Sequence, residues 1–249
     1  MTSVDADQVG QILDRRRGTL ISVEGVWGAG KTTTARLLGD RLRTRGFSTR
    51  VLHYGPETRT IEQIYKFVTE EPLRRRTGTG GFDAQHHATV DVFLRLCREA
   101  HHHIHSYRPA LEESDVVILD HGVYSKLAYY LAVLGEQHHP LRGAADLFAA
   151  IHAVIGPWFL FPDTALYLDV PWPLARERAI ARGTSDPDSI ERLLFLPRYV
   201  AAFRCIIRAE ATRIERVIVG TRSIEDVTSE LETRCLRFLC GNGLTGAEA

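Results

Sequence analysis

The stretch that decides the fold is Gly25-Val26-Trp27-Gly28-Ala29-Gly30-Lys31-Thr32. It has the GxxxxGK[ST] spacing of a phosphate-binding loop, called the P-loop below. Residues 19–24 before it are mostly apolar or β-branched, as in a buried parallel strand, and residues 33–38 begin an apolar helical pattern. Backbone N–H groups of such a loop, together with the N-terminus of the next helix, bind phosphate. We therefore predict a nucleotide site in which Lys31 reaches the outer phosphates and Thr32 helps to hold Mg²⁺.

Composition limits the remaining function classes. The chain has 249 residues, of which 44% are hydrophobic and 25% charged, and this is typical of one α/β domain. Lys plus Arg and Asp plus Glu balance at 31 each, so no basic field favours nucleic acid as a partner. No apolar run is long enough for a membrane span. The four cysteines have no CxxC spacing, which predicts reduced thiols in a cytoplasmic protein.

Strand and helix patterns alternate along the chain. We predict a flexible lead-in over residues 1–18, one domain over 19–240 and a disordered tail over 241–249. The expected strands are residues 19–24, 48–54, 116–120, 165–170 and 216–219. The main expected helices are residues 31–45, 84–107, 123–134, 144–155, 174–182, 186–215 with an interruption near Pro197, and 224–239. This order predicts a five-stranded parallel sheet with helices on both faces and ligands at the carboxyl ends of the strands.

Charged residues follow several of these strands. Asp120 ends a buried apolar strand, where a carboxylate can orient Mg²⁺ or its waters. Arg178 and Arg182 lie four residues apart on one predicted helix, and cations on one face can clamp a transferring phosphate. The N-K-x-D motif for guanine is impossible, because the only asparagine is Asn242 in the C-terminal tail.

Several stretches in order resemble thymidylate kinases. Residues 24–33 resemble the EGxxGAGKTT opening of that family, and residues 108–129 resemble its RPAL…VIxDRYxxSxxAYQ segment. Residues 167–183 resemble YLDVPPExxxxRxxxRG, and residues 188–191 resemble the DRIE that follows. The resemblance implies a P-loop NTPase three-layer sandwich with a five-stranded parallel sheet and an arginine-bearing lid. It also implies transfer of the γ-phosphoryl of ATP to dTMP, with Mg²⁺, by a homodimer.

The resemblance and the motifs together give a set of candidate site residues. The predicted catalytic residues are Lys31, Asp120, Arg178, Arg182 and Glu57, with Glu57 or Asp120 as a base if the acceptor is a hydroxyl. The predicted ATP-binding residues are Gly25, Trp27, Gly28, Ala29, Gly30, Lys31, Thr32, Thr33 and Arg176. The predicted acceptor-binding residues are Trp27, Leu94, Arg98, His121, Tyr124, Ser125, Tyr129 and Tyr130. The predicted metal ligands are Thr32 and Asp120.

The departures from the family pattern are concentrated in the acceptor half. Trp27 stands at or beside the family's acidic contact, Tyr54-Gly55-Pro56 replaces its Arg-Glu-Pro, and His121 replaces its phosphate-holding arginine. Tyr130 replaces a glutamine, Leu94 a phenylalanine, and Ser189 the arginine of DRIE. Arginine pairs bind dianionic phosphate strongly, so their loss predicts an acceptor other than ordinary dTMP. A modified nucleotide, a nucleoside, or another hydroxyl or phosphate compound is possible, and a nucleoside or nucleoside-like compound is expected to be a better substrate than dTMP. Two alternatives stay open. One is a nucleotide-binding regulatory protein without transfer activity. The other is a genuine dTMP kinase whose acceptor site is compensated, for example by an arginine of the Arg74-Arg75-Arg76 loop.

Overall fold

The computed structural model describes residues 18–53, 63, 84–134, 143–182 and 187–244. Their five strands form one parallel sheet in the order β2-β3-β1-β4-β5, which confirms the predicted architecture. The strands are β1 (Thr19–Glu24), β2 (Thr49–His53), β3 (Val116–Asp120), β4 (Thr164–Asp169) and β5 (Ile214–Ile218). Every residue of β1 and β3 is buried, as the centre of a sheet covered on both faces requires.

The register of the sheet brings the ends of its central strands together. Val23 of β1 lies beside Asp120 of β3, and Glu24 lies beside Tyr167 of β4. The P-loop follows β1 directly, so it leaves the sheet at the same edge as Asp120. This edge lies next to the point where the chain crosses from one side of β1 to the other, a common place for ligands in open α/β sheets.

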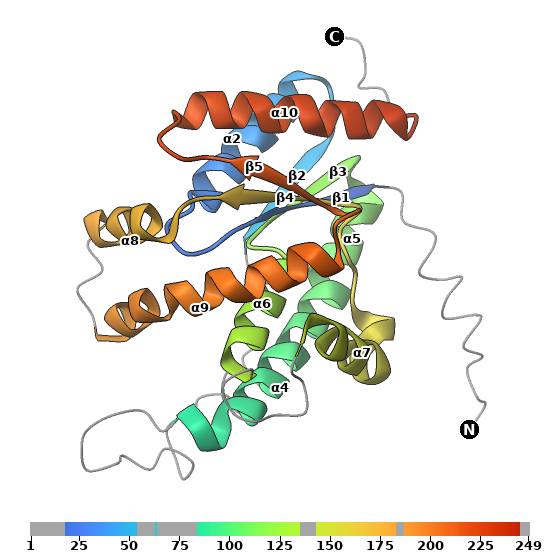
Figure 1. Cartoon of the computed structure of the whole chain (residues 1–249). Helices are drawn as coiled ribbons and strands as arrows, with labels where there is room; N and C mark the ends of the chain where they lie inside the picture. The colour runs from blue at the N-terminus through green and yellow to red at the C-terminus, as the bar shows by residue number, and fades with distance from the viewer. Residues whose placement is uncertain (1–17, 54–62, 64–83, 135–142, 183–186, 245–249) are drawn as a thin grey trace, which may run out of the picture.

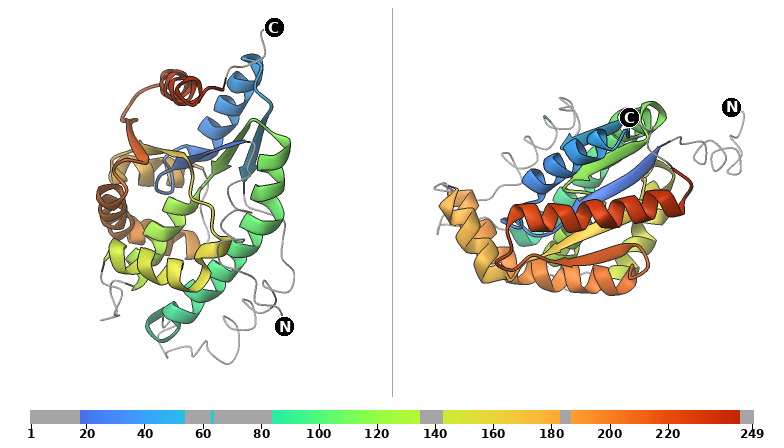
Figure 2. Two further views of the ribbon diagram at one scale, coloured as in Figure 1. Left: turned by 90° about the vertical axis from the view of Figure 1, so that its right-hand side faces the viewer. Right: turned by 90° about the horizontal axis from the view of Figure 1, so that it is seen from above.

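Helices cover both faces of the sheet (Figures 1 and 2). On one face lie α2 (Lys31–Thr44) and α10 (Ile224–Gly241), which contact each other. On the other face α6 (Val123–Leu134) packs against α9 (Pro187–Ala209) and α4 (Ala84–His102). The remaining helices are α5 (Arg108–Glu113), α7 (Ala144–Ile155) and α8 (Trp172–Ala181), with a 3₁₀ turn at Gly156–Trp158.

Two helices differ from the prediction. The expected helix over 84–107 ends at His102 and continues as a π-helical turn at His103–Tyr107 before α5. This wider turn lets both His103 and Tyr107 be buried. The expected interruption at Pro197 is wrong, because α9 runs through it. Leu196, Tyr199 and Phe203 are buried on either side of the proline, and this packing outweighs the single backbone hydrogen bond that proline removes.

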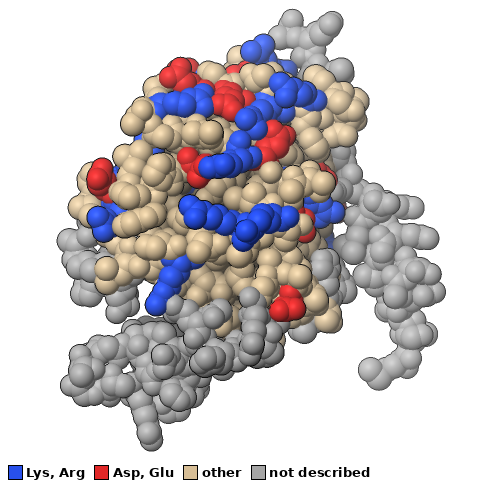
Figure 3. All heavy atoms as spheres, viewed as in Figure 1, with Lys and Arg blue, Asp and Glu red and all other residues tan. Residues whose placement is uncertain are grey.

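The ends of the domain extend slightly beyond the predicted limits. Gly18 is buried and its N–H donates to the Leu111 carbonyl, and α10 reaches Gly241 with Leu244 packed on the core. Residues 1–17 and 245–249 lie outside the described residues. Acidic and basic side chains are interspersed over this face of the molecule in Figure 3. Arg234 of α10 pairs with both Glu215 and Glu230. None of the helices in the described ranges is long and apolar enough to cross a membrane.

Candidate active site

The backbone of the P-loop takes conformations that glycine allows. Gly25, Gly28 and Gly30 have φ angles of 147°, 82° and 94°. Gly28 has a second reason to be glycine, since a Cβ there would collide with the carbonyl oxygen of Ala175 in α8. The loop therefore folds tightly against α8 and ends at the N-terminus of α2, where free N–H groups and the helix dipole favour an anion.

The side chain of Lys31 is buried against the P-loop backbone. Its ammonium donates a 2.9 Å hydrogen bond to the carbonyl of Val26, and the residue is 8% exposed. Burial lowers the pKa of Lys31 to about 8, although the charges of Asp120 and Glu24 act in the opposite direction and that of Arg182 adds to the lowering. A bound anion would favour the charged form of this lysine. Thr32 and Thr33 are exposed on the first turn of α2.

A first pocket, called the loop pocket, lies on the α10 side of the P-loop. It is lined by Gly28, Ala29, Gly30, Thr33, Thr34, Arg178, Arg182, Val219, Arg222, Ile224 and Val227. Arg178 reaches across from α8 and donates a 3.0 Å hydrogen bond to the Gly220 carbonyl after β5. Arg176 does not line this pocket. Its guanidinium lies over the ring of Trp172, 5.1 Å from the centroid, so the predicted ATP contact is not supported for it.

Asp120 supplies a carboxylate beside the P-loop lysine. Its Oδ2 lies 2.6 Å from Nδ1 of His53 on the neighbouring strand. Its Oδ1 is buried and has no hydrogen-bond partner in the described part of the chain. Mg²⁺ prefers oxygen ligands of this kind, directly or through water, so Asp120 and the hydroxyl of Thr32 fit the predicted metal. When bound, the ion neutralises phosphate charge.

Glu24, the residue before the P-loop, joins the loop to α6. Its carboxylate is fully buried and accepts hydrogen bonds from the N–H of Tyr124 at 3.3 Å and from the N–H and hydroxyl of Ser125 at 2.8 and 2.5 Å. A carboxylate at a helix N-terminus is favourable because it satisfies otherwise unpaired N–H groups. Tyr124 and Ser125 were predicted to bind the acceptor. Both are fully buried, and neither lines a pocket described here, so what the structure supports for them is a positioning role.

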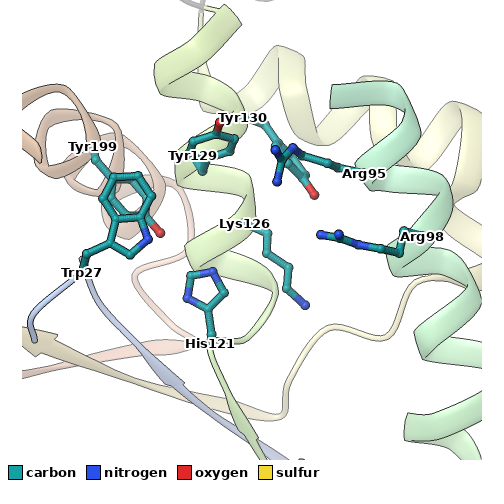
Figure 4. Close-up of a pocket in the computed structure, with 8 residues that line it drawn as sticks. All are labelled: Trp27, Arg95, Arg98, His121, Lys126, Tyr129, Tyr130 and Tyr199. Carbon is teal, nitrogen blue, oxygen red and sulfur yellow. The ribbon is translucent and has the colours of Figure 1, made fainter. Parts of the chain in front are cut away.

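A second pocket, called the aromatic pocket, lies on the other side of the P-loop (Figure 4). Eight residues line it: Trp27, Arg95, Arg98, His121, Lys126, Tyr129, Tyr130 and Tyr199. Figure 4 shows Trp27 and Tyr199 on one side, Arg95 and Arg98 opposite them on α4, and His121 and Lys126 between the two walls. Three of the lining residues are cationic and none is acidic, so the pocket suits a flat ligand that carries negative charge.

Trp27 is the centre of an aromatic cluster rather than a contact of the loop pocket. Its ring centroid lies 4.9 Å from that of Tyr199 and 6.1 Å from those of Tyr129 and Phe195. The Tyr199 hydroxyl donates a 2.7 Å hydrogen bond to the backbone carbonyl of Ser125, which ties α9 to α6. These contacts hold the rings rigidly, so they form a preformed flat wall for an aromatic ligand.

His121 lies in a left-handed conformation, with φ of 66°, at the turn from β3 to α6. It is the one non-glycine residue with positive φ among those that the structure describes. Burial lowers the pKa of His121 well below its ordinary value, and the charges of Lys31, Lys126, His53 and Arg98 lower it further. The imidazole is therefore neutral at physiological pH and cannot replace a permanent arginine charge.

The structure gathers most of the predicted residues and adds others. Leu94 does not line the aromatic pocket, and residues 54–57, which include Glu57, and residues 74–76 lie outside the described residues. Arg95, Lys126 and Tyr199 were not predicted from the sequence. Lys126 had a detectable signal, since it is the only charged residue in the otherwise apolar helix over 123–134. Tyr199 had none, because its contact with Trp27 joins segments far apart in the chain.

Comparison with known proteins identifies the family. The family model described as thymidylate kinase matches residues 23–231. A thymidylate kinase of Rhizorhabdus wittichii is 30% identical over 216 residues, covering 86% of this chain and 95% of that protein. A probable thymidylate kinase of Methanosarcina barkeri is 29% identical over 236 residues, covering 91% of this chain and 100% of that protein. The thymidylate kinase structure from Candida albicans has the same fold, with a TM-score of 0.62 at 20% identity, covering 91% of this chain and 93% of that one. Since the matched region contains the P-loop and both pockets, the chain belongs to the thymidylate kinase family.

Proposed function

We propose that this ATP-dependent kinase phosphorylates a nucleoside monophosphate, with dTMP as the first candidate. The observation that carries the proposal is the lining of the aromatic pocket, where Arg95, Arg98 and Lys126 face a wall of rings. A nucleotide has both features that such a lining recognises, a flat base and an anionic phosphate. The names of the relatives, which are thymidylate kinases, support the same class of acceptor.

This proposal revises the preference for a nucleoside that the sequence favoured. That preference rested on arginines lost at positions 54 and 121, and it took no account of Lys126 or Arg95. Cations gathered in one partly desolvated pocket raise the local concentration of anionic ligands and favour their binding. The favoured alternative thus becomes a dTMP kinase with a compensated acceptor site, in which the compensation comes from the described residues of α4 and α6.

The proposed reaction requires mostly positioning and charge neutralisation. The loop pocket would hold ATP, with its outer phosphates on the P-loop N–H groups and Lys31. Arg182 lies close enough to Lys31 to lower its pKa, so it is placed to stabilise charge on the phosphoryl group during transfer. A monophosphate acceptor attacks through an oxygen that is already ionised. No general base is then required, and the predicted role of Glu57 as a base is unnecessary.

The test is an acceptor screen with the purified full chain. ADP release, coupled to NADH oxidation, is measured with ATP, Mg²⁺ and either dTMP, dUMP, dCMP, thymidine or no acceptor. We expect kcat/KM for dTMP to exceed that for thymidine by about 100-fold, the value of one good charge-assisted contact. A preference for thymidine would restore the altered-acceptor hypothesis. ATP binding without any transfer would favour the regulatory alternative. The homodimer and the cytoplasmic location stay predictions, and light scattering on the eluting protein tests the first.

A further inference from the structure

One ion pair in the aromatic pocket differs from the surface pairs of the molecule. Lys126 of α6 is 7% exposed, and its ammonium contacts the carboxylate of Glu99, which is 1% exposed on α4. The hydroxyl of Tyr107, in the π-helical turn, lies 3.4 Å from the same ammonium. The pair thus joins two helices at the wall of a pocket, and one of its members lines that pocket.

Glu99 holds a second cation beside the first. Its Oε1 lies 4.0 Å from Nε of Arg98, and neither atom has a hydrogen-bond partner among the described residues. The Arg98 side chain is 25% exposed and lines the pocket. One carboxylate therefore keeps two cations side by side, and the three groups together carry a net positive charge that faces the space in Figure 4.

Stability alone does not explain this arrangement. Taking a lysine and a glutamate out of water costs several kcal/mol per ion, and apolar residues of similar volume often stabilise a protein equally well. The rest of α6 is apolar or aromatic apart from Ser125, so the helix would pack on α4 without a lysine. A charged group kept at such a cost in a pocket wall points to a ligand.

The chemistry of the two cations defines that ligand. Lysine and arginine have N–H donors and no acceptor, so an atom that meets them must accept hydrogen bonds. Burial tends to lower the pKa of Lys126, but the Glu99 carboxylate more than offsets this effect and the pKa is raised, so the donor stays charged over the whole physiological range. Its neighbour His121 is neutral there and supplies no such charge.

We propose that Lys126 is a specificity-determining residue that binds an oxygen of the acceptor, with Glu99 and Tyr107 as the positioning residues that aim its ammonium. The inference rests on the proposed function, because it takes the aromatic pocket as the acceptor site. Of the hydrogen-bond-accepting oxygens of a pyrimidine nucleotide, two would make Lys126 discriminate between acceptors, an anionic phosphate oxygen and the carbonyl oxygen at position 4 of the ring, whereas the carbonyl at position 2 and the sugar hydroxyls are common to dTMP, thymidine and dCMP. Both accept hydrogen bonds, and an amino group at position 4, as in cytosine, does not.

The test removes the pair as a unit. Lys126→Met alone would leave the Glu99 carboxylate buried without its partner, and the protein could fail to fold for that reason. The double variant Glu99→Gln with Lys126→Met removes both charges of the buried pair together, and Arg98, whose side chain is 25% exposed, keeps its charge. A matched control neutralises the exposed pair between Arg50 and Glu113, which lies outside both pockets, as Arg50→Met with Glu113→Gln. Dissociation constants for dTMP, thymidine, dCMP and ATP are measured by calorimetry, and thermal unfolding is followed alongside.

The double variant should bind dTMP about 10- to 100-fold more weakly, the range for a lost hydrogen bond to a charged group, while ATP binding stays unchanged. If Lys126 binds the phosphate, thymidine binding is unaffected. If it binds the carbonyl at position 4, thymidine weakens by the same factor and dCMP does not. Either pattern supports the assignment. Unchanged dTMP binding, or an equal loss for dTMP, thymidine and dCMP, overturns it. If the wild-type protein binds none of the three acceptors, the proposed function fails first, and the assignment fails with it.

Discussion

The loop pocket and the aromatic pocket lie on opposite sides of the P-loop. The first is formed largely by backbone and the second by side chains. The loop pocket uses glycine backbone, the N-terminus of α2 and three arginines at its margin. The aromatic pocket uses side chains from the P-loop, α4, α6, α9 and the end of β3. A backbone site depends on a few consecutive residues, whereas a side-chain site can change its chemistry through single substitutions that leave the fold intact. This explains why the family pattern is retained on one side and rewritten on the other.

The largest expected effect separates the two pockets through Lys31. Lys31→Ala should lower kcat by about 10³-fold or more, because the P-loop lysine stabilises the transferring phosphoryl charge. The substitution lies outside the aromatic pocket lining, so dTMP binding should change less than threefold. Coupled ADP release and calorimetry measure the two quantities. Near-normal turnover in a folded Lys31→Ala protein would show that the P-loop has another role.

Two arginines, Arg178 in α8 and Arg182 at its C-terminal end, are expected to have different effects. Arg182 lies near Lys31, so Arg182→Ala should reduce kcat by about 100-fold with a small change in KM for ATP. Arg178 instead bonds the Gly220 carbonyl across the loop pocket, so Arg178→Ala should raise KM for ATP by about tenfold and leave kcat within a factor of three. Steady-state kinetics on both variants test this difference. Identical effects would mean that the arginines act as one solvated face.

Removal of the aromatic wall should affect only the acceptor. Trp27→Ala eliminates the ring that contacts Tyr199 and Phe195, and stacking of a base on an aromatic side chain contributes about 1–3 kcal/mol. The dissociation constant for dTMP should therefore rise by about 10- to 100-fold, with that for ATP unchanged. If ATP binding weakened as much as dTMP binding, the original assignment of Trp27 to the ATP site would be the better one.

The use of ATP and the binding of dTMP should also depend differently on pH. The pKa of Lys31 in the free protein is about 8, so the ammonium is charged below that pH and loses its proton above it. The value of kcat/KM for ATP, which reports the free enzyme, should fall about tenfold per unit above pH 8. Binding of dTMP should show no such fall, because the raised pKa of Lys126 keeps that group charged. A profile for ATP that stays flat to pH 9.5 would contradict the burial effect on Lys31.

The smallest effect is expected at His121. His121→Arg restores the family's arginine, and should tighten dTMP binding relative to thymidine by about threefold. The gain is limited because position 121 has a φ of 66°, a conformation that costs free energy for side chains without local hydrogen bonding. Calorimetry with both ligands measures the ratio. A gain of 100-fold would show that the native pocket holds the acceptor phosphate poorly and that Lys126 does not compensate.

The loop pocket could be predicted from the sequence more completely than the aromatic pocket. The spacing of Gly25 to Thr32 and the strand before it are local features, and the structure confirms the strand, the loop and the helix in order. Trp27, Arg98 and His121 were found by resemblance, and all three line the aromatic pocket. The resemblance did not distinguish the residues that line the pocket from the buried residues that only position them. Ser125 matched the family motif, yet its hydroxyl is buried against Glu24.

Contacts between segments that are far apart in the sequence could not be predicted. The partner of Lys126 lies 27 residues earlier in another helix, and nothing in the spacing of Glu99 indicates that they meet. The π-helical turn at His103–Tyr107 has no local signal either, although it brings Tyr107 within reach of Lys126. These contacts depend on how α4 packs against α6, which periodicity predicts only as buried or exposed faces.

The most direct test of the two-pocket account is a crystal structure of the protein with dTMP, Mg²⁺ and a non-hydrolysable ATP analogue. We expect the triphosphate over Gly28 to Thr32 and the dTMP base between the Trp27 ring and α4, with a dTMP oxygen within hydrogen-bond distance of the Lys126 ammonium. If dTMP were bound in the loop pocket, or were absent from the aromatic pocket at saturating concentration, the aromatic pocket would not be the acceptor site.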